Sequence, residues 1–324
     1  MGLTISVVIT TYNQARYIEE TLRSVFSQTY PALEIIVVDD GSTDDTPNLL
    51  AGYGNTIRYI RQKNQGVASS RNTGISHARG EYVALLDGDD LWEPEKLAVQ
   101  MTAAKNSPHA GLVVANGVEF DDGGILEPSL LRDVENKLQL QKDQIVTVPY
   151  YEHALEWNPV WTVSQVMIPR AVLQDVGPSD PTFRCGSDYD LYLRIGQHYD
   201  MTFIMQPLVK WRYLTTSASG GREIRALRYR LDHVLALKKQ LRTTLEPRRR
   251  LIKAVLKRRI PLASESAYYY GRTHDRALST RMLWQLLTID VTLIPLAYLM
   301  ALYVPSTIVH GTAPTIRRIL GLPR

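Results

Sequence analysis

The stretch YVALLDGDD, residues 82–90, decides the fold of this 324-residue chain. Its first part, Tyr82 to Leu86, is a short apolar run typical of a strand that is buried on both faces. Two similar runs precede it, Leu3 to Ile9 and Leu33 to Val38. Such runs alternate with helical patterns, of which Ala15 to Phe26 is one. The sequence therefore predicts an α/β domain with a mostly parallel sheet flanked by helices.

A polar cluster follows each of the three predicted strands. The clusters are Thr10 to Asn13, Asp39 to Ser42 and Asp87 to Asp90. Ligands of open parallel sheets bind beyond the carboxyl ends of the strands, so we expect the clusters to form one site. An aspartate such as Asp39 or Asp40 can accept a hydrogen bond there from a nucleotide base or a ribose hydroxyl. Capping of a helix that starts near Thr43 is the alternative role.

The third cluster brings several carboxylates close together. Asp87, Asp89 and Asp90 lie within four residues, and like charges at such a distance repel one another. Carboxylate oxygens suit Mg²⁺ or Mn²⁺, which proteins bind through one or two carboxylates together with substrate phosphates. We predict a divalent metal site here, with a solvated acidic turn as the alternative. Arg71 could reach a diphosphate at this site, although its spacing alone also fits a surface arginine.

Four segments together resemble the family 2 glycosyltransferases. They are Ser6 to Asn13, Glu34 to Asp44, Gly66 to Gly74 and Leu86 to Asp90, in the family's order. The resemblance implies the GT-A nucleotide-sugar transferase fold and a nucleotide-diphosphate-sugar donor. It also implies a divalent metal cofactor, Mn²⁺ or Mg²⁺, and inversion of configuration at the anomeric carbon.

The resemblance also implies roles for single residues. The matching nucleotide contacts are Thr10, Tyr12, Asp39, Asp40, Arg71 and Asp87. Tyr12 would lie near the base, and Arg71 near the base and the diphosphate. Asp87 and Asp89 match the outer carboxylates of the family's Asp-x-Asp motif, with Asp89 as the surer metal ligand.

The segment Arg184 to Arg194 resembles the part of the family that supplies the general base. The resemblance implies that Asp188 removes the proton of the acceptor hydroxyl, whereas an N-cap role in the following helix is the alternative. Two positions depart from the family's pattern. Ser187 stands where a glutamate is common, and Leu214 stands where a histidine often binds the metal, which leaves the third metal ligand open.

Other aromatic and basic residues are candidate contacts of the diphosphate or the acceptor. Trp211 and Arg212 fit the family's strand that precedes Leu214. Trp157 and Trp161 could stack on the apolar faces of sugar rings. Packing within a subdomain explains the same aromatic residues.

Charge is divided unevenly along the chain, whose net charge is +4. Residues 222–324 hold 20 lysine and arginine residues against 6 acidic ones, whereas residues 1–221 hold 17 against 27. We therefore predict a GT-A domain over 1–221 and a basic, α-helical, membrane-associating extension over 222–324. Its amphipathic patterns favour an anionic membrane surface as the partner. Nucleic acid is not an expected partner, because no nucleic-acid-binding motif is present.

The extension also contains a long apolar segment, 282–309, with Asp290 as its one formal charge. Its uninterrupted apolar core is shorter than the roughly 20 residues of a spanning helix, so an interfacial or re-entrant placement is favoured over spanning. The chain's first residues lack the pattern of a secretory signal. We expect a cytoplasmic location, peripheral on the inner face of the cell membrane.

The sequence thus predicts an inverting, metal-dependent glycosyltransferase. It would move a sugar from a nucleotide-diphosphate sugar, with UDP or dTDP favoured, to a hydroxyl of a glycan or lipid-linked acceptor, as in cell-surface polysaccharide synthesis. A sugar nucleotidyltransferase is disfavoured, because Thr10 to Asn13 replaces the Gly-rich loop usual in that class. A non-catalytic nucleotide-sugar-binding protein or scaffold of a glycan assembly complex is the alternative, supported by Ser187 and Leu214.

Overall fold

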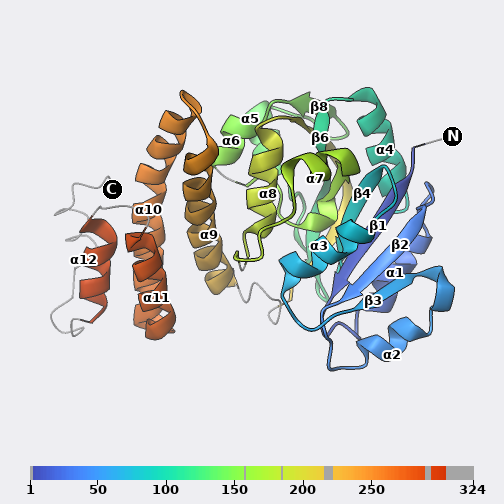
Figure 1. Cartoon of the computed structure of the whole chain (residues 1–324), viewed down its shortest axis with the longest axis horizontal. Helices are drawn as coiled ribbons and strands as arrows, with labels where there is room; N and C mark the ends of the chain where they lie inside the picture. The colour runs from blue at the N-terminus through green and yellow to red at the C-terminus, as the bar shows by residue number, and fades with distance from the viewer. Residues whose placement is uncertain (1–2, 157, 184, 215–221, 289–292, 304–324) are drawn as a thin grey trace. The chain divides into compact units, whose positions relative to one another are not determined.

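The computed structural model describes residues 3–156, 158–183, 185–214, 222–288 and 293–303 (Figure 1). The chain divides into two compact units, residues 1–214 and 215–324. The first unit is an α/β domain, as predicted from the alternation of strands and helices, and the second unit is helical.

The first unit is built on one mixed sheet with the strand order β3-β2-β1-β4-β9-β6-β10-β5. The strands on one side of the sheet are parallel: β1 (Ile5–Thr11), β2 (Glu34–Asp39), β3 (Arg58–Arg61) and β4 (Tyr82–Asp87). The other side is mixed and contains β5 (Leu91–Trp92), β6 (Ala110–Asp121), β9 (Val166–Pro169) and β10 (Asp200–Arg212). Two short strands, β7 (Gly124–Glu127) and β8 (Ile145–Val148), pair with β6 and β10.

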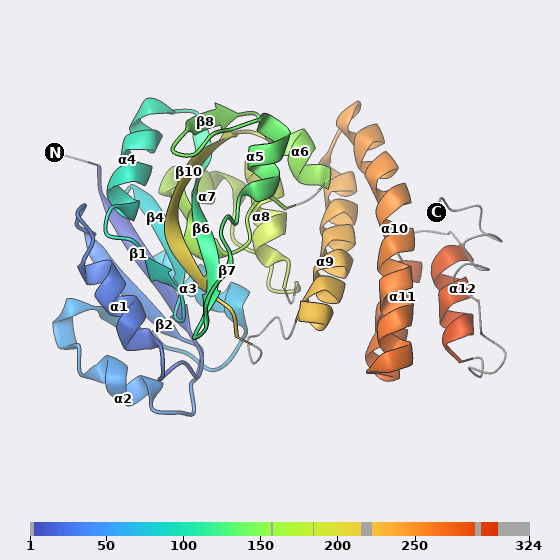
Figure 2. The ribbon, with the colours of Figure 1, turned by 180° about the vertical axis from the view of Figure 1, so that it is seen from behind.

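Helices cover both faces of this sheet. Figure 2 shows α1 (Ile18–Phe26) and α4 (Lys96–Asn106) on one face, where they share a core with β1. The opposite face carries α3 (Val67–His77), α7 (Arg170–Val176) and α8 (Ser187–Gly196) (Figure 1). The shorter elements are α2 (Thr46–Ala51), η1 (Gly54–Thr56), α5 (Arg132–Leu138), α6 (Tyr151–Glu156) and η2 (Val163–Gln165).

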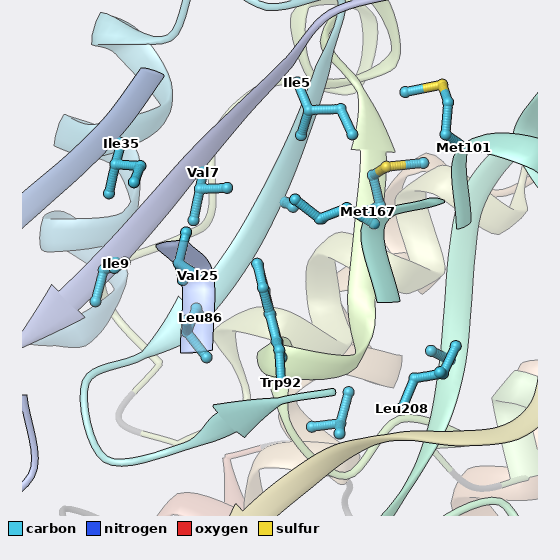
Figure 3. Packing of buried hydrophobic residues seen from close by; sticks show 14 of the residues in the cluster. Ile5, Val7, Ile9, Val25, Ile35, Leu86, Trp92, Met101, Met167 and Leu208 are labelled. Atoms are coloured by element: carbon cyan, nitrogen blue, oxygen red, sulfur yellow. The ribbon is translucent and has the colours of Figure 1, made fainter. Parts of the chain in front are cut away.

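Apolar, β-branched residues fix the central strands. β1 has the sequence ISVVITT and is buried along its whole length, because its alternate side chains point to the two covered faces. Figure 3 shows Val7 and Ile9 of β1 in one cluster with Val25 of α1 and Leu86 of β4. Full burial of such a side chain contributes about 1.5–3 kcal/mol. This core holds β1 and β4 in a register that brings Thr10 opposite Asp87.

Helix α3 approaches β1 closely because Gly74 has no side chain. A Cβ atom at Gly74 would lie 2.2 Å from Val8 Cγ1 and 3.3 Å from Val38 Cγ2. The close approach brings Arg71, one turn before Gly74, to the carboxyl end of the sheet.

The second unit consists of α9 (Arg222–Thr243), α10 (Arg248–Thr273), α11 (Arg276–Leu287) and α12 (Leu293–Leu302). Helix α10 packs against the other three, and its apolar face, which includes Ile252, Val255 and Ile260, is buried. Within the parts of the chain that the structure describes, no helix is both long and apolar enough to cross a bilayer. Residues 289–292 and 304–309 of the apolar segment lie outside those parts.

Candidate active site

The loops after β1 and β2 are fixed to each other by hydrogen bonds. Asn13 has a left-handed backbone conformation (φ 53°), which asparagine adopts more readily than most residues. Its side-chain oxygen accepts the Thr43 N–H at 2.7 Å, and its own N–H donates to Ser42 Oγ at 2.9 Å. The Asp44 carboxylate accepts the Ala15 N–H at 3.0 Å. The two loops therefore form one connected rim at the edge of the sheet.

Protein donors enclose the carboxylates of Asp39 and Asp40. Asp39 is fully buried and accepts a hydrogen bond from Tyr59 Oη at 2.9 Å. Burial, together with this hydrogen bond, raises the pKa of Tyr59 to about 12. Asp40 accepts the N–H groups of Gln65 and Gly66 at 3.0 and 2.8 Å. Asp40 thus shapes the loop that leads into α3, and the contact of either carboxylate with a base or ribose stays a prediction.

Arg71, Asp87 and Thr10 meet at the carboxyl ends of β1 and β4. Arg71 Nη2 donates to the two Asp87 oxygens at 2.9 and 3.3 Å, and Thr10 Oγ1 donates to Asp87 Oδ1 at 3.3 Å. Arg71 is buried, so water screens this ion pair less than an exposed one. Tyr12 lies half exposed on the rim. The structure thus brings together three of the predicted nucleotide contacts.

Asp188 lies in the first turn of α8 and belongs to the same group of charges. Burial raises the pKa of its carboxyl group, and the positive charge of Arg71 opposes that rise. Asp188 Oδ1 accepts the Tyr189 N–H at 2.8 Å. A raised pKa suits a carboxylate that has to accept a proton near neutral pH. The neighbouring Ser187, at the position of the family's glutamate, is buried.

Two residues that were not predicted hold α8 against α3. Asn72 of α3 exchanges two hydrogen bonds with the Ser179 backbone, at 2.8 and 2.9 Å. Arg194 of α8 donates to the carbonyls of Gly177 and Pro178, at 3.1 and 2.8 Å. Because both contacts are made to one loop, that loop links the helix carrying Asp188 to the helix carrying the arginine of the site.

Residues 87–90 form an acidic loop, and its last aspartate, Asp90, has a structural role. It is 1% exposed and accepts hydrogen bonds from Ser164 Oγ at 2.5 Å, Thr162 Oγ1 at 3.1 Å and the Arg212 N–H at 2.9 Å. Burial is the main cause that raises its pKa, and the adjacent carboxylates add to it. Asp90 therefore anchors the loop to η2 and β10, and both of its carboxylate oxygens accept hydrogen bonds from protein donors.

Asp89 is partly exposed, and burial together with the Asp87 charge raises its pKa to about 7. A divalent cation fits this pair of repelling carboxylates, because it would supply the missing positive charge. Leu214 offers no ligand atom. Among the described residues, no group of three His, Cys, Asp or Glu side chains could hold a metal ion. Asp87 and Asp89 fit a metal ion that would be coordinated by these two carboxylates and, in addition, by substrate phosphates.

Arg212, a predicted diphosphate contact, is hydrogen-bonded to the acidic loop. Its Nε donates to the Asp89 carbonyl at 2.9 Å, and its Nη2 donates to Glu20 Oε2 at 2.6 Å. The guanidinium carbon lies 4.8 Å from the centre of the Tyr17 ring and 4.5 Å from that of Phe120. These contacts fix the loop that carries Asp89, and a contact of Arg212 with a diphosphate stays a prediction.

Two of the predicted tryptophans pack against each other. Trp161 and Trp211 form an edge-to-face pair with 5.9 Å between ring centres, and Trp161 is 45% exposed. Trp161 directly precedes Thr162, which binds Asp90, so the pair lies close to the acidic loop. A cavity of about 190 Å³ is lined by residues 121–123 and by residues 212–214, which directly follow Trp211 in the chain. Trp157 lies outside the described residues.

Comparison with known proteins decides the family. Residues 6–170 match the model of glycosyl transferase family 2. The chain belongs to this family. It spans between 35% and 63% of the lengths of the first curated relatives that it matches.

The similar proteins include a putative biosynthetic glycosyltransferase and two solved structures. The putative teichuronic acid biosynthesis glycosyltransferase TuaG of Bacillus subtilis is 42% identical over 101 residues, which are 30% of this chain and 40% of TuaG. TarS 1–349 of S. aureus, solved in complex with UDP, has a TM-score of 0.58 at 18% identity, over 89% of this chain and 81% of that chain. The mannosyltransferase PcManGT from Pyrobaculum calidifontis, solved with GDP-Man and Mn²⁺, has a TM-score of 0.56 at 23% identity, over 93% and 86%. The two structures confirm the predicted GT-A-like fold.

Several residues that shape the site have weak or no sequence signals. Asn13 has a local signal, because asparagine after a strand is typical of a left-handed turn position. Ser164 has none, since it lies 74 residues from its partner Asp90. Only the folded sheet brings these two side chains together.

Proposed function

We propose that this chain is an inverting glycosyltransferase that moves a sugar from a UDP- or dTDP-sugar to a hydroxyl of a glycan or lipid-linked acceptor. The observation that carries the proposal is the grouping of Arg71, Asp87 and Asp188 at the carboxyl edge of the sheet. The reaction needs a cation beside the leaving diphosphate and a base beside the acceptor, and this grouping supplies candidates for both.

The leaving group of this reaction is a nucleoside diphosphate, whose negative charge has to be stabilised. Arg71 is the buried cation that would contact the diphosphate. Asp87 and Asp89 would hold Mn²⁺ or Mg²⁺, which when bound supplies electrostatic stabilisation of the departing phosphates. The UDP complex of TarS and the GDP-Man and Mn²⁺ complex of PcManGT support a nucleotide-sugar donor and a divalent metal. Tyr12, exposed on the rim, would stack on the base.

Asp188 would act as the general base. It takes the proton of the acceptor hydroxyl while the acceptor oxygen forms a bond to the anomeric carbon. The bond from that carbon to the diphosphate oxygen breaks, and its electron pair leaves with the nucleoside diphosphate. Attack on the face opposite the leaving group inverts the configuration. The raised pKa of Asp188 supports this role, because it makes the carboxylate a stronger base.

The acceptor side of the proposal rests on exposed aromatic and basic side chains. Trp161, exposed beside the acidic loop, would stack on an acceptor sugar. In the second unit, α10 presents Lys253 and Lys257 to solvent, and Trp284 and Met300 are exposed apolar side chains. Basic and apolar groups together support an anionic membrane surface as the partner, on the cytoplasmic side. The name of TuaG supports a place in surface polymer synthesis.

Replacing Asp188 by asparagine tests the proposal. The variant keeps the shape of the side chain but cannot accept the proton, so transfer falls by about 10²–10⁴-fold while donor affinity is retained. Asp175→Asn is the matched control, because Asp175 is bonded to Tyr199 and is not part of the site; it leaves the rate unchanged. Transfer by Asp188→Asn at the wild-type rate would refute the base assignment. Donor binding by the wild type without any turnover, across glycan and lipid-linked acceptors, would favour the scaffold alternative.

A further inference from the structure

Tyr192 is a buried tyrosine at the candidate active site. Its side chain is 1% exposed, and the hydroxyl has no hydrogen-bond partner among the described residues. Tyr192 lies on α8, one turn after Asp188. Side chains on a helix point back toward its N-terminus and meet the residue four positions earlier. The ring of Tyr192 is therefore directed toward Asp188.

The charges that act on Tyr192 are those of the candidate site. They come from three elements: Asp188 of α8, Arg71 of α3 and Asp87 of β4. Burial raises the pKa of Tyr192, and among the three charges that of Asp188 has the largest effect. The hydroxyl thus lies within the electrostatic range of the proposed base and of the ion pair that would hold the diphosphate.

A second tyrosine on α8, Tyr189, differs from Tyr192 because its hydroxyl has a hydrogen-bond partner. Tyr189 is as buried as Tyr192, and its hydroxyl donates to the Ala154 carbonyl at 2.6 Å. Burying a hydroxyl without a partner lowers stability, so the Tyr192 hydroxyl is available to bond a group that reaches the site. Arg71 Nε is a further buried donor without a partner in the described chain. Both unused donors belong to the same group of side chains.

We infer that Tyr192 is a positioning residue for Asp188. Its hydroxyl donates a hydrogen bond to the Asp188 carboxylate, directly or through one water, when donor and acceptor are bound. Together with the Tyr189 N–H, which already donates to Asp188 Oδ1, this bond fixes the plane of the carboxylate relative to the acceptor hydroxyl. The inference rests on the proposed role of Asp188 as the base. It predicts an effect on turnover and not on donor binding.

The substitution Tyr192→Phe removes the hydroxyl and keeps the ring. We expect kcat for sugar transfer to fall about tenfold, while KM for the donor and the Kd of the nucleotide stay within about twofold. The melting temperature does not fall, because Tyr192→Phe removes no hydrogen bond to the residues that the structure describes. Tyr199→Phe is the control outside the site. It loses the hydrogen bond from its hydroxyl to Asp175, and its kcat stays at the wild-type value.

The double variant Asp188→Asn/Tyr192→Phe tests whether Tyr192 acts through Asp188. If it does, adding Tyr192→Phe does not lower the residual rate of Asp188→Asn further. A further tenfold loss in that background, or a wild-type kcat for the single variant Tyr192→Phe, would overturn the inference while the proposed function stands. Full activity of Asp188→Asn alone is a different failure: it would remove the proposed base, and the inference with it.

Discussion

Replacing Asp90 by alanine removes the anchor of the acidic loop. The carboxylate is 1% exposed and accepts hydrogen bonds from Ser164, Thr162 and the Arg212 backbone. Each such bond contributes about 0.5–1.5 kcal/mol, so their loss lowers the free energy of unfolding by about 3 kcal/mol. The variant also removes the buried charge and its repulsion from the adjacent carboxylates, both of which raise the pKa of Asp90 and offset part of the loss. We therefore expect a net loss of about 2 kcal/mol.

For an α/β unit of about 200 residues, this loss corresponds to a fall in melting temperature of about 4–8 °C. Thermal melts and urea titrations of the full chain measure it. Asp90→Asn is the control: its amide oxygen accepts from the Arg212 N–H, and the Ser164 and Thr162 hydroxyls can turn to accept from its amide group. We expect it to lose less than about 1 kcal/mol. A melting temperature of Asp90→Ala within 1 °C of the wild type would refute the anchoring role, and equal losses in both variants would mean that the charge itself is required.

Two further predictions concern Asp89 of the acidic loop and the basic face of the second unit. The pKa of Asp89 in the folded protein, about 7, lies above the roughly 3.9 of an unfolded aspartate; its stabilising contribution is therefore complete below the lower value and is lost as pH rises through 7. In the presence of a metal chelator, the melting temperature of the wild type falls as pH rises from about 4 to 7, and Asp89→Asn flattens this dependence. A slope equal to that of the wild type would contradict this explanation. Lys253→Glu combined with Lys257→Glu reverses the charge of an exposed face of α10, so co-sedimentation with anionic vesicles at low salt falls about tenfold, with neutral vesicles as the control. Undiminished binding would exclude electrostatic docking through this face.

Three of the four parallel strands were predictable because each is a local apolar run followed by a polar turn, whereas β3, with the sequence RYIR, has no such pattern. β1, β2 and β4 match the predicted runs, and their polar ends meet at one edge as expected. The mixed half had no such signal. β9 is four residues long and is placed by antiparallel pairing with β4 and β6, contacts that no local pattern encodes.

The sequence predicted which residue types form the candidate site. It did not predict which of them are buried by contacts within the protein and which stay exposed. Asp87, Asp89 and Asp90 are near neighbours in the sequence, yet Asp90 is buried as an anchor while Asp89 stays partly exposed. The difference arises from η2 and β10, which reach the loop from 74 and more residues away. The two tyrosines of α8 differ for the same reason, since Tyr189 meets the Ala154 carbonyl and Tyr192 does not.

A donor-binding screen tests the central claim most directly. The melting temperature of the full chain would be measured with UDP-, dTDP- and GDP-sugars, with and without Mn²⁺. A donor at about 100 times its Kd stabilises the fold by about 2.7 kcal/mol, which raises the melting temperature by about 5–10 °C. We expect this rise for a UDP- or dTDP-sugar, only with Mn²⁺ present, and not in Asp89→Asn. A rise that is independent of both Mn²⁺ and Asp89, or none with any donor, would contradict the proposed metal-dependent transferase site.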